Sequence, residues 1–164
     1  DEKITQIVER YEYVELTPDQ IDLVVHKAKK FHRLNFLEAK AMAEVISRLK
    51  PDVAYVDASD VSCERFAKQI LEDLSFDVKM VCEHHADRRY PVVSAASILA
   101  KVRRDDEIAR LREEYGDFGS GYVTDARTIK FLKNWIEQHG SPPPIVRQSW
   151  KTLKKLQSSE QTTL

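Results

Sequence analysis

The segment formed by residues 53–82 constrains the fold more than any other part of the chain. Residues 53–56 are continuously apolar, as in a strand covered on both faces, and residues 76–82 alternate apolar and charged side chains as in a second strand. Residues 64–74, which lie between them, fit a helix. A strand, a helix and a strand joined by short connections predict a parallel pair with a right-handed crossover. Ligands of such sheets bind beyond the carboxyl ends of the strands, where Asp57 lies.

Asp57 and Asp87 are candidate ligands for a divalent metal ion. Each follows a short apolar run, and thirty residues separate them in the sequence. Carboxylates brought together from distant parts of a chain form the oxygen-rich sites that divalent metals use in phosphate chemistry. The spacing alone leaves a second interpretation open, in which both residues are helix caps or turn formers, and Asp60 is the better candidate for a cap.

Two other pairs of residues bear on metal and redox chemistry. Adjacent histidines in a strand point to opposite faces, and His84 and His85 have no cysteine or third histidine at ligand spacing, so a zinc site is disfavoured. Cys63 and Cys82 lack a CxxC spacing. They predict two reduced, half-buried thiols rather than a disulfide or a metal site.

The rest of the sequence predicts mostly helices. Alternating apolar and charged residues at 11–16 predict a half-exposed strand. Apolar periodicity and capping signals predict helices at residues 3–11, 17–28, 34–49, 124–135 and 146–157, and a long helix that opens at Pro91. We expect one α/β domain over residues 1–157, with C-terminal helices from about residue 124, and a disordered tail at residues 158–164.

The composition fits one soluble globular domain. At 164 residues, with 42% hydrophobic and 32% charged residues, the chain is long enough to bury a core. No stretch approaches the roughly 20 apolar residues of a membrane span, and the first residues do not resemble a signal peptide. We expect a cytoplasmic protein that does not bind a membrane.

Basic residues cluster locally, although the formal net charge of −1 argues against wholesale electrostatic binding of nucleic acid. One cluster follows Asp87 and comprises Arg88, Arg89, Lys101, Arg103 and Arg104. The other lies in residues 145–156 and comprises Arg147, Lys151, Lys154 and Lys155. Solvated helix faces and phosphate-binding patches are both open interpretations. The glycine-rich turn at 118–122 is equally open: it is an ordinary turn between helices, or it lets backbone approach a sugar-phosphate beside a stacking ring on Tyr122.

Four sequence blocks become more specific in combination. They are Tyr-Val-Asp-Ala-Ser-Asp-Val at 55–61, the segment 83–105 with Ala-Asp-Arg-Arg-Tyr-Pro-Val-Val-Ser-Ala-Ala-Ser, Gly-Asp-Phe-Gly-Ser-Gly-Tyr at 116–122, and the basic segment 143–155. Their order and content closely resemble archaeal ribonuclease HII, the type 2 ribonuclease H. The resemblance covers nearly the whole chain.

The resemblance implies a ribonuclease H-like mixed sheet flanked by helices, with a C-terminal helical extension. It implies an endonuclease that hydrolyses the RNA strand of RNA–DNA hybrids and cleaves DNA at single ribonucleotides, leaving 5′-phosphate and 3′-hydroxyl ends. We expect this enzyme to be a monomer. The cofactor is Mg²⁺ or Mn²⁺. The matching positions make Asp57 and Asp87 the catalytic metal ligands and Tyr122 the reader of the RNA–DNA junction, with further substrate contacts from Gly121, Arg147 and Lys151.

One departure from the family pattern bears on activity. The family begins with a strand carrying Asp-Glu-Ala-Gly-Arg-Gly, which supplies two further carboxylates, whereas here Lys3-Ile4-Thr5 follows Asp1-Glu2. We therefore expect the first two strands to be missing. Two carboxylates alone bind magnesium weakly. The sequence leaves open an enzyme, an inactive fragment, and a non-catalytic module that binds RNA–DNA hybrids.

Overall fold

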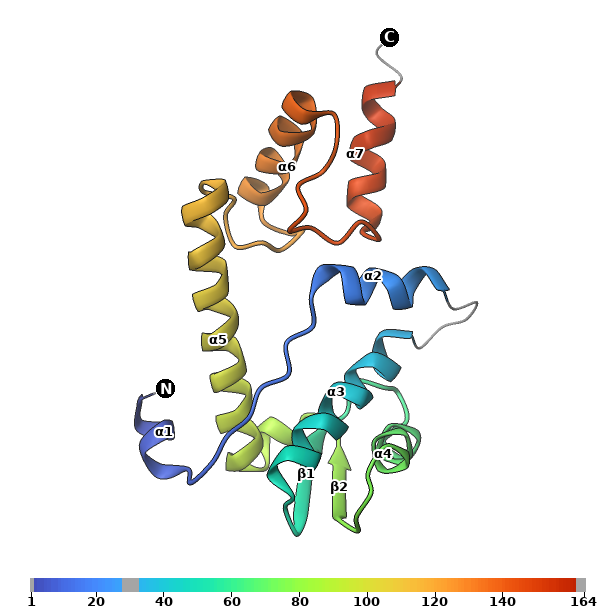
Figure 1. Cartoon of the computed structure of the whole chain (residues 1–164), viewed down its shortest axis with the longest axis vertical. Helices are drawn as coiled ribbons and strands as arrows, with labels where there is room; N and C mark the ends of the chain where they lie inside the picture. The colour runs from blue at the N-terminus through green and yellow to red at the C-terminus, as the bar shows by residue number, and fades with distance from the viewer. Residues whose placement is uncertain (1, 28–32, 162–164) are drawn as a thin grey trace. The chain divides into compact units, whose positions relative to one another are not determined.

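The computed structural model describes residues 2–27 and 33–161. They form a mostly helical α/β protein with a small parallel sheet (Figure 1). No helix within these residues is long and apolar enough to cross a membrane. The α/β class is as predicted, but the only sheet in the described residues is a parallel pair, not a mixed sheet. The absence of two strands stays a prediction.

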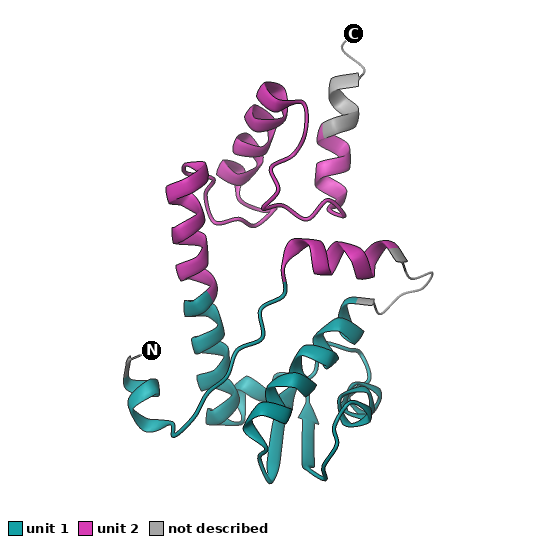
Figure 2. Ribbon diagram, in the orientation of Figure 1, with its two compact units in different colours: residues 1–16, 28–103 teal, residues 17–27, 104–164 magenta. Residues whose placement is uncertain are grey.

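The chain divides into two compact units, each of which is described by itself below. Figure 2 colours residues 1–16 and 28–103 as the first unit and residues 17–27 and 104–164 as the second. The single domain predicted for residues 1–157 stays a prediction.

The first unit contains the strand–helix–strand segment. Its elements are α1 (Glu2–Ile7), α3 (Arg33–Leu49), β1 (Val53–Asp57), α4 (Cys63–Glu72), β2 (Lys79–Glu83), the 3-10 turn η1 (Ala86–Arg88) and the first part of α5 (Pro91–Tyr115). β1 and β2 pair in parallel, as predicted, and the register places Asp57 opposite Glu83. The two strands therefore end at the same edge.

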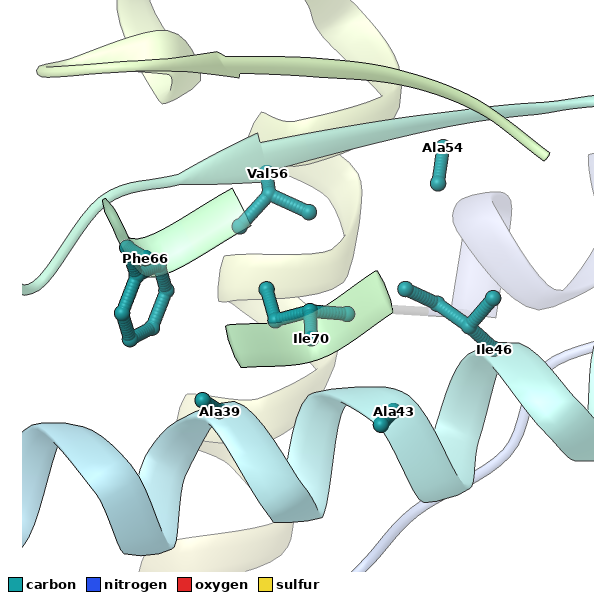
Figure 3. Close-up of a cluster of buried hydrophobic side chains, with 7 residues drawn as sticks. All are labelled: Ala39, Ala43, Ile46, Ala54, Val56, Phe66 and Ile70. Carbon is teal, nitrogen blue, oxygen red and sulfur yellow. The ribbon is translucent and has the colours of Figure 1, made fainter. Parts of the chain in front are cut away.

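The core of the first unit lies between the sheet and two helices (Figure 3). Small side chains on α3 let it approach closely, and α4 places its two buried residues, Phe66 and Ile70, into the space between. The buried cluster comprises Ala39, Ala43, Ile46, Ala54, Val56, Phe66 and Ile70. The helix predicted at residues 34–49 is present as α3, but its buried face differs from the predicted one. Ala39 and Ala43 pack on the sheet beside Ile46, and of these only Ile46 belonged to the predicted apolar face.

The strand predicted at residues 11–16 is wrong, because these residues form neither strand nor helix. A strand needs a neighbouring strand for its backbone hydrogen bonds, and a side chain satisfies part of this backbone instead. Arg48 Nη1 donates to the Tyr13 carbonyl at 3.0 Å and lies 3.6 Å from the Glu12 carboxylate. Nearby, Arg103 pairs with Glu15 at 2.6 Å.

A buried carboxylate organises the loop after β1. Asp60 is 1% exposed, pairs with Arg65, and accepts hydrogen bonds from Asn35 Nδ2 at 3.0 Å and from the Ser62 amide at 2.9 Å. The bond from Asn35, followed by the Ser62 amide and Arg65, lowers the pKa of Asp60 well below its usual range despite burial. Asp60 is not the helix cap that we predicted: Ser62 caps α4, its side chain accepting from the Arg65 amide.

The second unit is helical in its described residues. It contains α2 (Pro18–Lys27), the rest of α5, α6 (Ala126–His139) and α7 (Lys151–Gln161). The predicted capping box of α2 is present, with Thr17 N donating to Gln20 Oε1 at 2.9 Å and Gln20 N to Thr17 Oγ1 at 3.3 Å. Its buried side chains include Phe118, Thr128, Leu132, Ile136 and Leu153.

The last helix begins at Lys151, five residues later than residue 146, the predicted start. The carboxylate of Asp22, on α2, accepts from the Gln148 amide at 2.5 Å and from the Ser149 amide at 3.0 Å, so these amides do not join a helix. Burial by itself would raise the pKa of Asp22, but the bonds from Ser149 and Gln148 and the Arg147 charge lower it.

Other predicted boundaries also need correction. α1 ends at Ile7, so residues 8–11 are not helical. β2 begins at Lys79, because β1 begins at Val53 and offers no partner to residues 76–78. α7 extends to Gln161, so residues 158–161 are helical rather than disordered, and 162–164 lie outside the described residues.

We predict that Phe66→Ala lowers the free energy of unfolding by about 3–5 kcal/mol, because the ring is fully buried and its loss leaves a cavity. Phe36→Ala is the matched control: Phe36 is 47% exposed on α3, and we expect a loss of about 1 kcal/mol or less. Urea denaturation checks both values. Equal losses in the two variants would show that the cluster in Figure 3 is not the core.

We predict that Asp60→Asn destabilises the chain by roughly 1–3 kcal/mol near neutral pH, because the buried Asp60 side chain loses its charge and its ion pair with the partly exposed Arg65. A carboxylate whose folded-state pKa is lowered stabilises above its unfolded pKa of about 4, and this contribution is lost as the pH falls. Unfolding free energies measured from neutral to acidic pH should therefore fall less steeply in Asp60→Asn. Asp77→Asn, at an exposed position, should keep the steeper acid dependence; parallel curves for both variants would contradict the assignment.

Candidate metal and nucleic-acid site

The Asp57 side chain links the ends of the two strands. Its Oδ1 accepts a hydrogen bond from the Ala86 amide at 3.3 Å, and the Ala58 amide donates to the Glu83 carbonyl at 3.0 Å. Ala86 is fully buried, so this contact has a fixed position. Because Asp87 is the next residue, the two predicted metal ligands come from segments that meet at one edge of the sheet.

Asp87 lies in the 3-10 turn η1 and is exposed. The turn is closed by the Arg89 and Tyr90 amides, which donate to the Ala86 carbonyl at 3.1 and 2.9 Å. His85 precedes it with φ 57°, in the left-handed region, so the histidine pair belongs to a turn and not to a strand. The strand argument that we used against zinc therefore does not apply here.

Glu83 ties the turn that carries Asp87 to the end of β2. Its carboxylate accepts from Tyr90 Oη at 2.8 Å and from Arg89 Nη1 at 2.5 Å. The bond to Glu83 raises the pKa of Tyr90. The Tyr90 ring in turn packs on Tyr55 of β1, with ring centroids 4.7 Å apart. Sequence reasoning missed this support, although the charged and aromatic residues around Asp87 were a visible signal.

The two cysteines lie close to Asp57 in the first unit. Both are free and half-buried, as predicted. Burial, followed by the neighbouring Cys63 thiol and the Asp57 charge, raises the pKa of Cys82 to about 11. Cys82 is therefore a neutral thiol near neutral pH.

Asp57 and Asp87 are the type of ligand that a hard divalent cation binds, but two carboxylates are too few to hold it. Carboxylate oxygens are the ligands that Mg²⁺ and Mn²⁺ prefer. In residues 2–27 and 33–161, however, no group of three or more His, Cys, Asp or Glu side chains is arranged to hold a metal. A metal bound by Asp57 and Asp87 would need further oxygen ligands.

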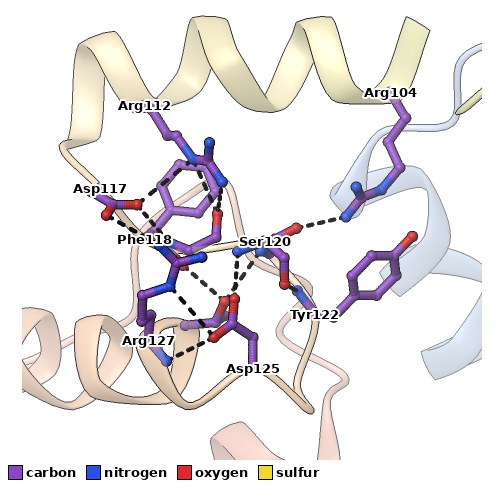
Figure 4. A network of polar contacts seen from close by, with 11 residues as sticks. Arg104, Arg112, Asp117, Phe118, Ser120, Tyr122, Asp125 and Arg127 are labelled. Carbon is purple, nitrogen blue, oxygen red and sulfur yellow. Dashed lines mark hydrogen bonds and ion pairs between the residues drawn. The ribbon is translucent and has the colours of Figure 1, made fainter. Parts of the chain in front are cut away.

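In the second unit, Asp125 organises the glycine-rich turn (Figure 4). It caps α6: one carboxylate oxygen accepts from the Arg127 amide at 2.9 Å and the other from the Ser120 amide at 2.7 Å. These two amides, Ser120 first, lower the pKa of Asp125 to about 2. Thr128 Oγ1 accepts from the Gly121 amide at 3.1 Å and donates to the Phe118 carbonyl at 2.8 Å.

The glycines of this turn are required by space and conformation. Gly119 has φ +74°, and a Cβ there would lie 2.6 Å from an Asp125 carboxylate oxygen. Gly121 has φ +75°, and a Cβ would lie 3.1 Å from Ile108 Cδ1. The Gly119, Ser120 and Gly121 amides donate to side chains on either side of the turn, so this conformation does not offer them to a phosphate.

The other predicted substrate residues also lie in the second unit. Tyr122 is 55% exposed, and the Arg104 guanidinium covers its ring at 4.1 Å from the centroid. Lys151 is exposed at the start of α7. Arg147 is half-buried, with Nη2 3.5 Å from Ser149 Oγ, so it is less accessible than we expected. The metal candidates belong to the first unit and these residues to the second.

Comparison with known proteins gives one consistent result. The family model described as Ribonuclease HII matches residues 1–153. Curated ribonuclease HII of Thermococcus sibiricus is 48% identical over 162 residues, which are 98% of this chain and 70% of that protein. For ribonuclease HII of Pyrococcus abyssi the identity is 46% over 156 residues, 95% of this chain and 68% of that protein.

Solved structures agree with the sequence relatives. The crystal structure of ribonuclease H2 from Pyrococcus horikoshii OT3 matches with a TM-score of 0.87 at 40% identity, covering 98% of this chain and 74% of that one. The ribonuclease HII of Archaeoglobus fulgidus, solved in complex with PCNA, matches with a TM-score of 0.76 at 43% identity, covering 87% and 66%. With a family model over nearly its whole length and relatives well above 30% identity, this chain belongs to the ribonuclease HII family.

Proposed function

We propose that the chain provides part of an endonuclease site that hydrolyses the RNA strand of RNA–DNA hybrids and single ribonucleotides embedded in DNA, leaving 5′-phosphate and 3′-hydroxyl ends. The observation that carries the proposal is the hydrogen bond from the Ala86 amide to Asp57, which brings Asp57 beside the turn that carries Asp87. In a ribonuclease HII these positions match the family's metal-binding aspartates.

Each carboxylate has a separate role in this proposal. The Ala86 amide engages Oδ1 of Asp57 and fixes that carboxylate, which leaves Oδ2 for a cation. Asp87, exposed on its turn, completes the site and orients the attacking water. Mg²⁺ or Mn²⁺ would stabilise the charge that develops on the phosphate. Glu83 keeps the Asp87 turn in place through Arg89 and Tyr90.

Recognition of the RNA strand is assigned to the second unit. Tyr122 presents an exposed ring and hydroxyl from a turn that is fixed by its own hydrogen bonds. Gly121 contributes by allowing the turn that presents Tyr122, because its φ of +75° and the nearby Ile108 disfavour any side chain at this position. Lys151, and to a smaller extent the half-buried Arg147, supply positive charge to the phosphates.

A non-catalytic module that binds hybrids is the second candidate. It is favoured by the small number of metal-binding side chains brought together in the described residues. Binding through Tyr122 and Lys151 requires no metal, so such a module would bind without cleaving. The two candidates differ in a single measurable property, which is hydrolysis.

We predict that the chain, incubated with Mg²⁺ or Mn²⁺ and a DNA duplex that contains one ribonucleotide, cleaves at the ribonucleotide. Asp57→Asn and Asp87→Asn should each slow cleavage by at least about a hundredfold, because each removes a charged metal ligand. Asp77→Asn removes the same charge at an exposed position between α4 and β2 and should leave the rate unchanged. Full activity of Asp57→Asn would refute the metal role; binding of the duplex without cleavage by the unaltered chain would favour the non-catalytic module.

We also predict that Lys151→Ala weakens binding to a hybrid and to a DNA duplex by similar factors. If Lys151 contacts one phosphate, the slope of log affinity against log salt concentration should fall by about one. Fluorescence anisotropy at several salt concentrations measures this slope. Lys68→Ala, at an exposed position on α4, is the matched control for charge; the same change in slope for both variants would show that only net charge matters.

A further inference from the structure

The Tyr122 ring lies against the guanidinium of Arg104, and more than half of the residue is exposed. The guanidinium carbon of Arg104, on α5, lies 4.1 Å from the ring centroid, while 55% of Tyr122 is exposed (Figure 4). A planar guanidinium over an aromatic face is attracted by the electron density of the ring. This contact restricts a ring that is otherwise surrounded largely by solvent.

Arg104 is itself fixed to the turn that carries Tyr122. Its Nη2 donates to the Ser120 carbonyl at 2.8 Å, two residues before Tyr122. Its Nη1 pairs with the Asp105 carboxylate at 3.1 Å, and its side chain is only 34% exposed. One guanidinium therefore contacts the ring and also the backbone beside that ring, so that movement of either partner would disturb the other contact.

The backbone of Tyr122 is also held in place. Its carbonyl accepts from the Asp125 amide at 3.0 Å, and its amide donates to Ser120 Oγ at 3.4 Å. Behind the turn, Gly121 packs against Ile108 and Arg104 of α5. With the backbone fixed in this way, the remaining freedom of Tyr122 is rotation of its side chain, which is the motion that Arg104 opposes.

We propose that Arg104 is a positioning residue that holds Tyr122 in one rotamer, so that the exposed part of the ring and the hydroxyl meet the sugar of the RNA strand. The proposal rests on the proposed function of Tyr122 in distinguishing a ribonucleotide from a deoxyribonucleotide. Arg104 acts through Tyr122 rather than by contacting a phosphate. Lysine cannot replace it, because an ammonium group has neither the planar face nor the fork that reaches the Ser120 carbonyl.

A double-mutant cycle separates these two roles. Arg104→Lys keeps the charge and removes the planar contact, and Tyr122→Ala removes the ring. The readout is the ratio of affinities for a duplex with one ribonucleotide and the same duplex made of DNA, measured by anisotropy without divalent metal so that hydrolysis does not interfere. We expect Arg104→Lys to reduce this ratio by about two- to fivefold, the range of a cation–π contact at an exposed site.

In the Tyr122→Ala background the same substitution should have no further effect on the ratio. Arg110→Lys is the matched control, since Arg110 lies on the same helix and pairs with Glu107 and Glu114 instead of the turn. It should leave the ratio unchanged. An equal loss from Arg104→Lys with and without the Tyr122 ring would overturn the proposal in favour of a direct contact with nucleic acid, and an unchanged ratio in Arg104→Lys would overturn it outright.

A second measurement tests positioning without nucleic acid. Scalar couplings across the Cα–Cβ bond of Tyr122 should report one rotamer in the unaltered chain and an average in Arg104→Lys, with equal unfolding midpoints. Unchanged couplings in Arg104→Lys would overturn the proposal. If the unaltered chain shows no preference for the ribonucleotide, the proposed function of Tyr122 fails, while the couplings still decide whether Arg104 positions the ring.

Discussion

The parallel pairing of β1 with β2 is the constraint on which the candidate metal site depends. Its register places Asp57 opposite Glu83, so both strands end at the same edge and their following turns begin side by side. The Ala86 amide then reaches the Asp57 carboxylate at 3.3 Å, which an offset of one residue would prevent, because it would turn the Asp57 side chain to the other face of the sheet. The core formed by α3 and α4 fixes this register, since Ala54 and Val56 must face the helices. The same register therefore buries Ala54 and Val56 and places Asp57 at the carboxyl end of β1.

Outside the regular elements, three aspartates determine the conformation of the chain. Asp60 holds the loop after β1, Asp125 holds the glycine-rich turn and caps α6, and Asp22 accepts the amides that precede α7. In each case a short carboxylate accepts two or more hydrogen bonds, at least one of them from a backbone amide that has no partner within a helix or strand. Such amides are costly to bury unpaired, and an ionised acceptor stabilises them more than a neutral one does. The same bonds lower the pKa of all three carboxyl groups. The stabilisation that these carboxylates give to their loops is therefore lost as the pH falls.

The sequence pattern predicted those features that depend mainly on neighbouring residues. The parallel strand pair, the helix beginning at Pro91 and the capping box of Thr17 and Gln20 are present as expected. The predictions were wrong where residues distant in the sequence determine the local structure. Residues 11–16 have the alternation of a strand but find Arg48 instead of a neighbouring strand, and α7 starts late because Asp22, more than a hundred residues away, binds its preceding amides. For the site, position after a strand indicated Asp57, whereas the support from Glu83 and Arg104 depends on side-chain geometry that spacing does not encode.

The turn that carries Tyr122 and the sheet edge that carries Asp57 differ in what holds them together. The turn that carries Tyr122 is complete in itself: Asp125, Thr128 and Arg104 satisfy its amides and carbonyls and cover one face of the ring. At the end of the two strands, the Ala86 amide fixes the backbone beside Asp57. Two carboxylates, however, leave most of the coordination sphere of a divalent cation to other oxygen atoms. The surface proposed to recognise nucleic acid therefore forms without a metal, whereas the proposed hydrolysis needs one. In the proposed function, phosphate oxygens of a bound nucleic acid would be additional ligands for a metal at Asp57 and Asp87, so the nucleic acid would strengthen metal binding there, and by reciprocity the metal would strengthen binding of the nucleic acid.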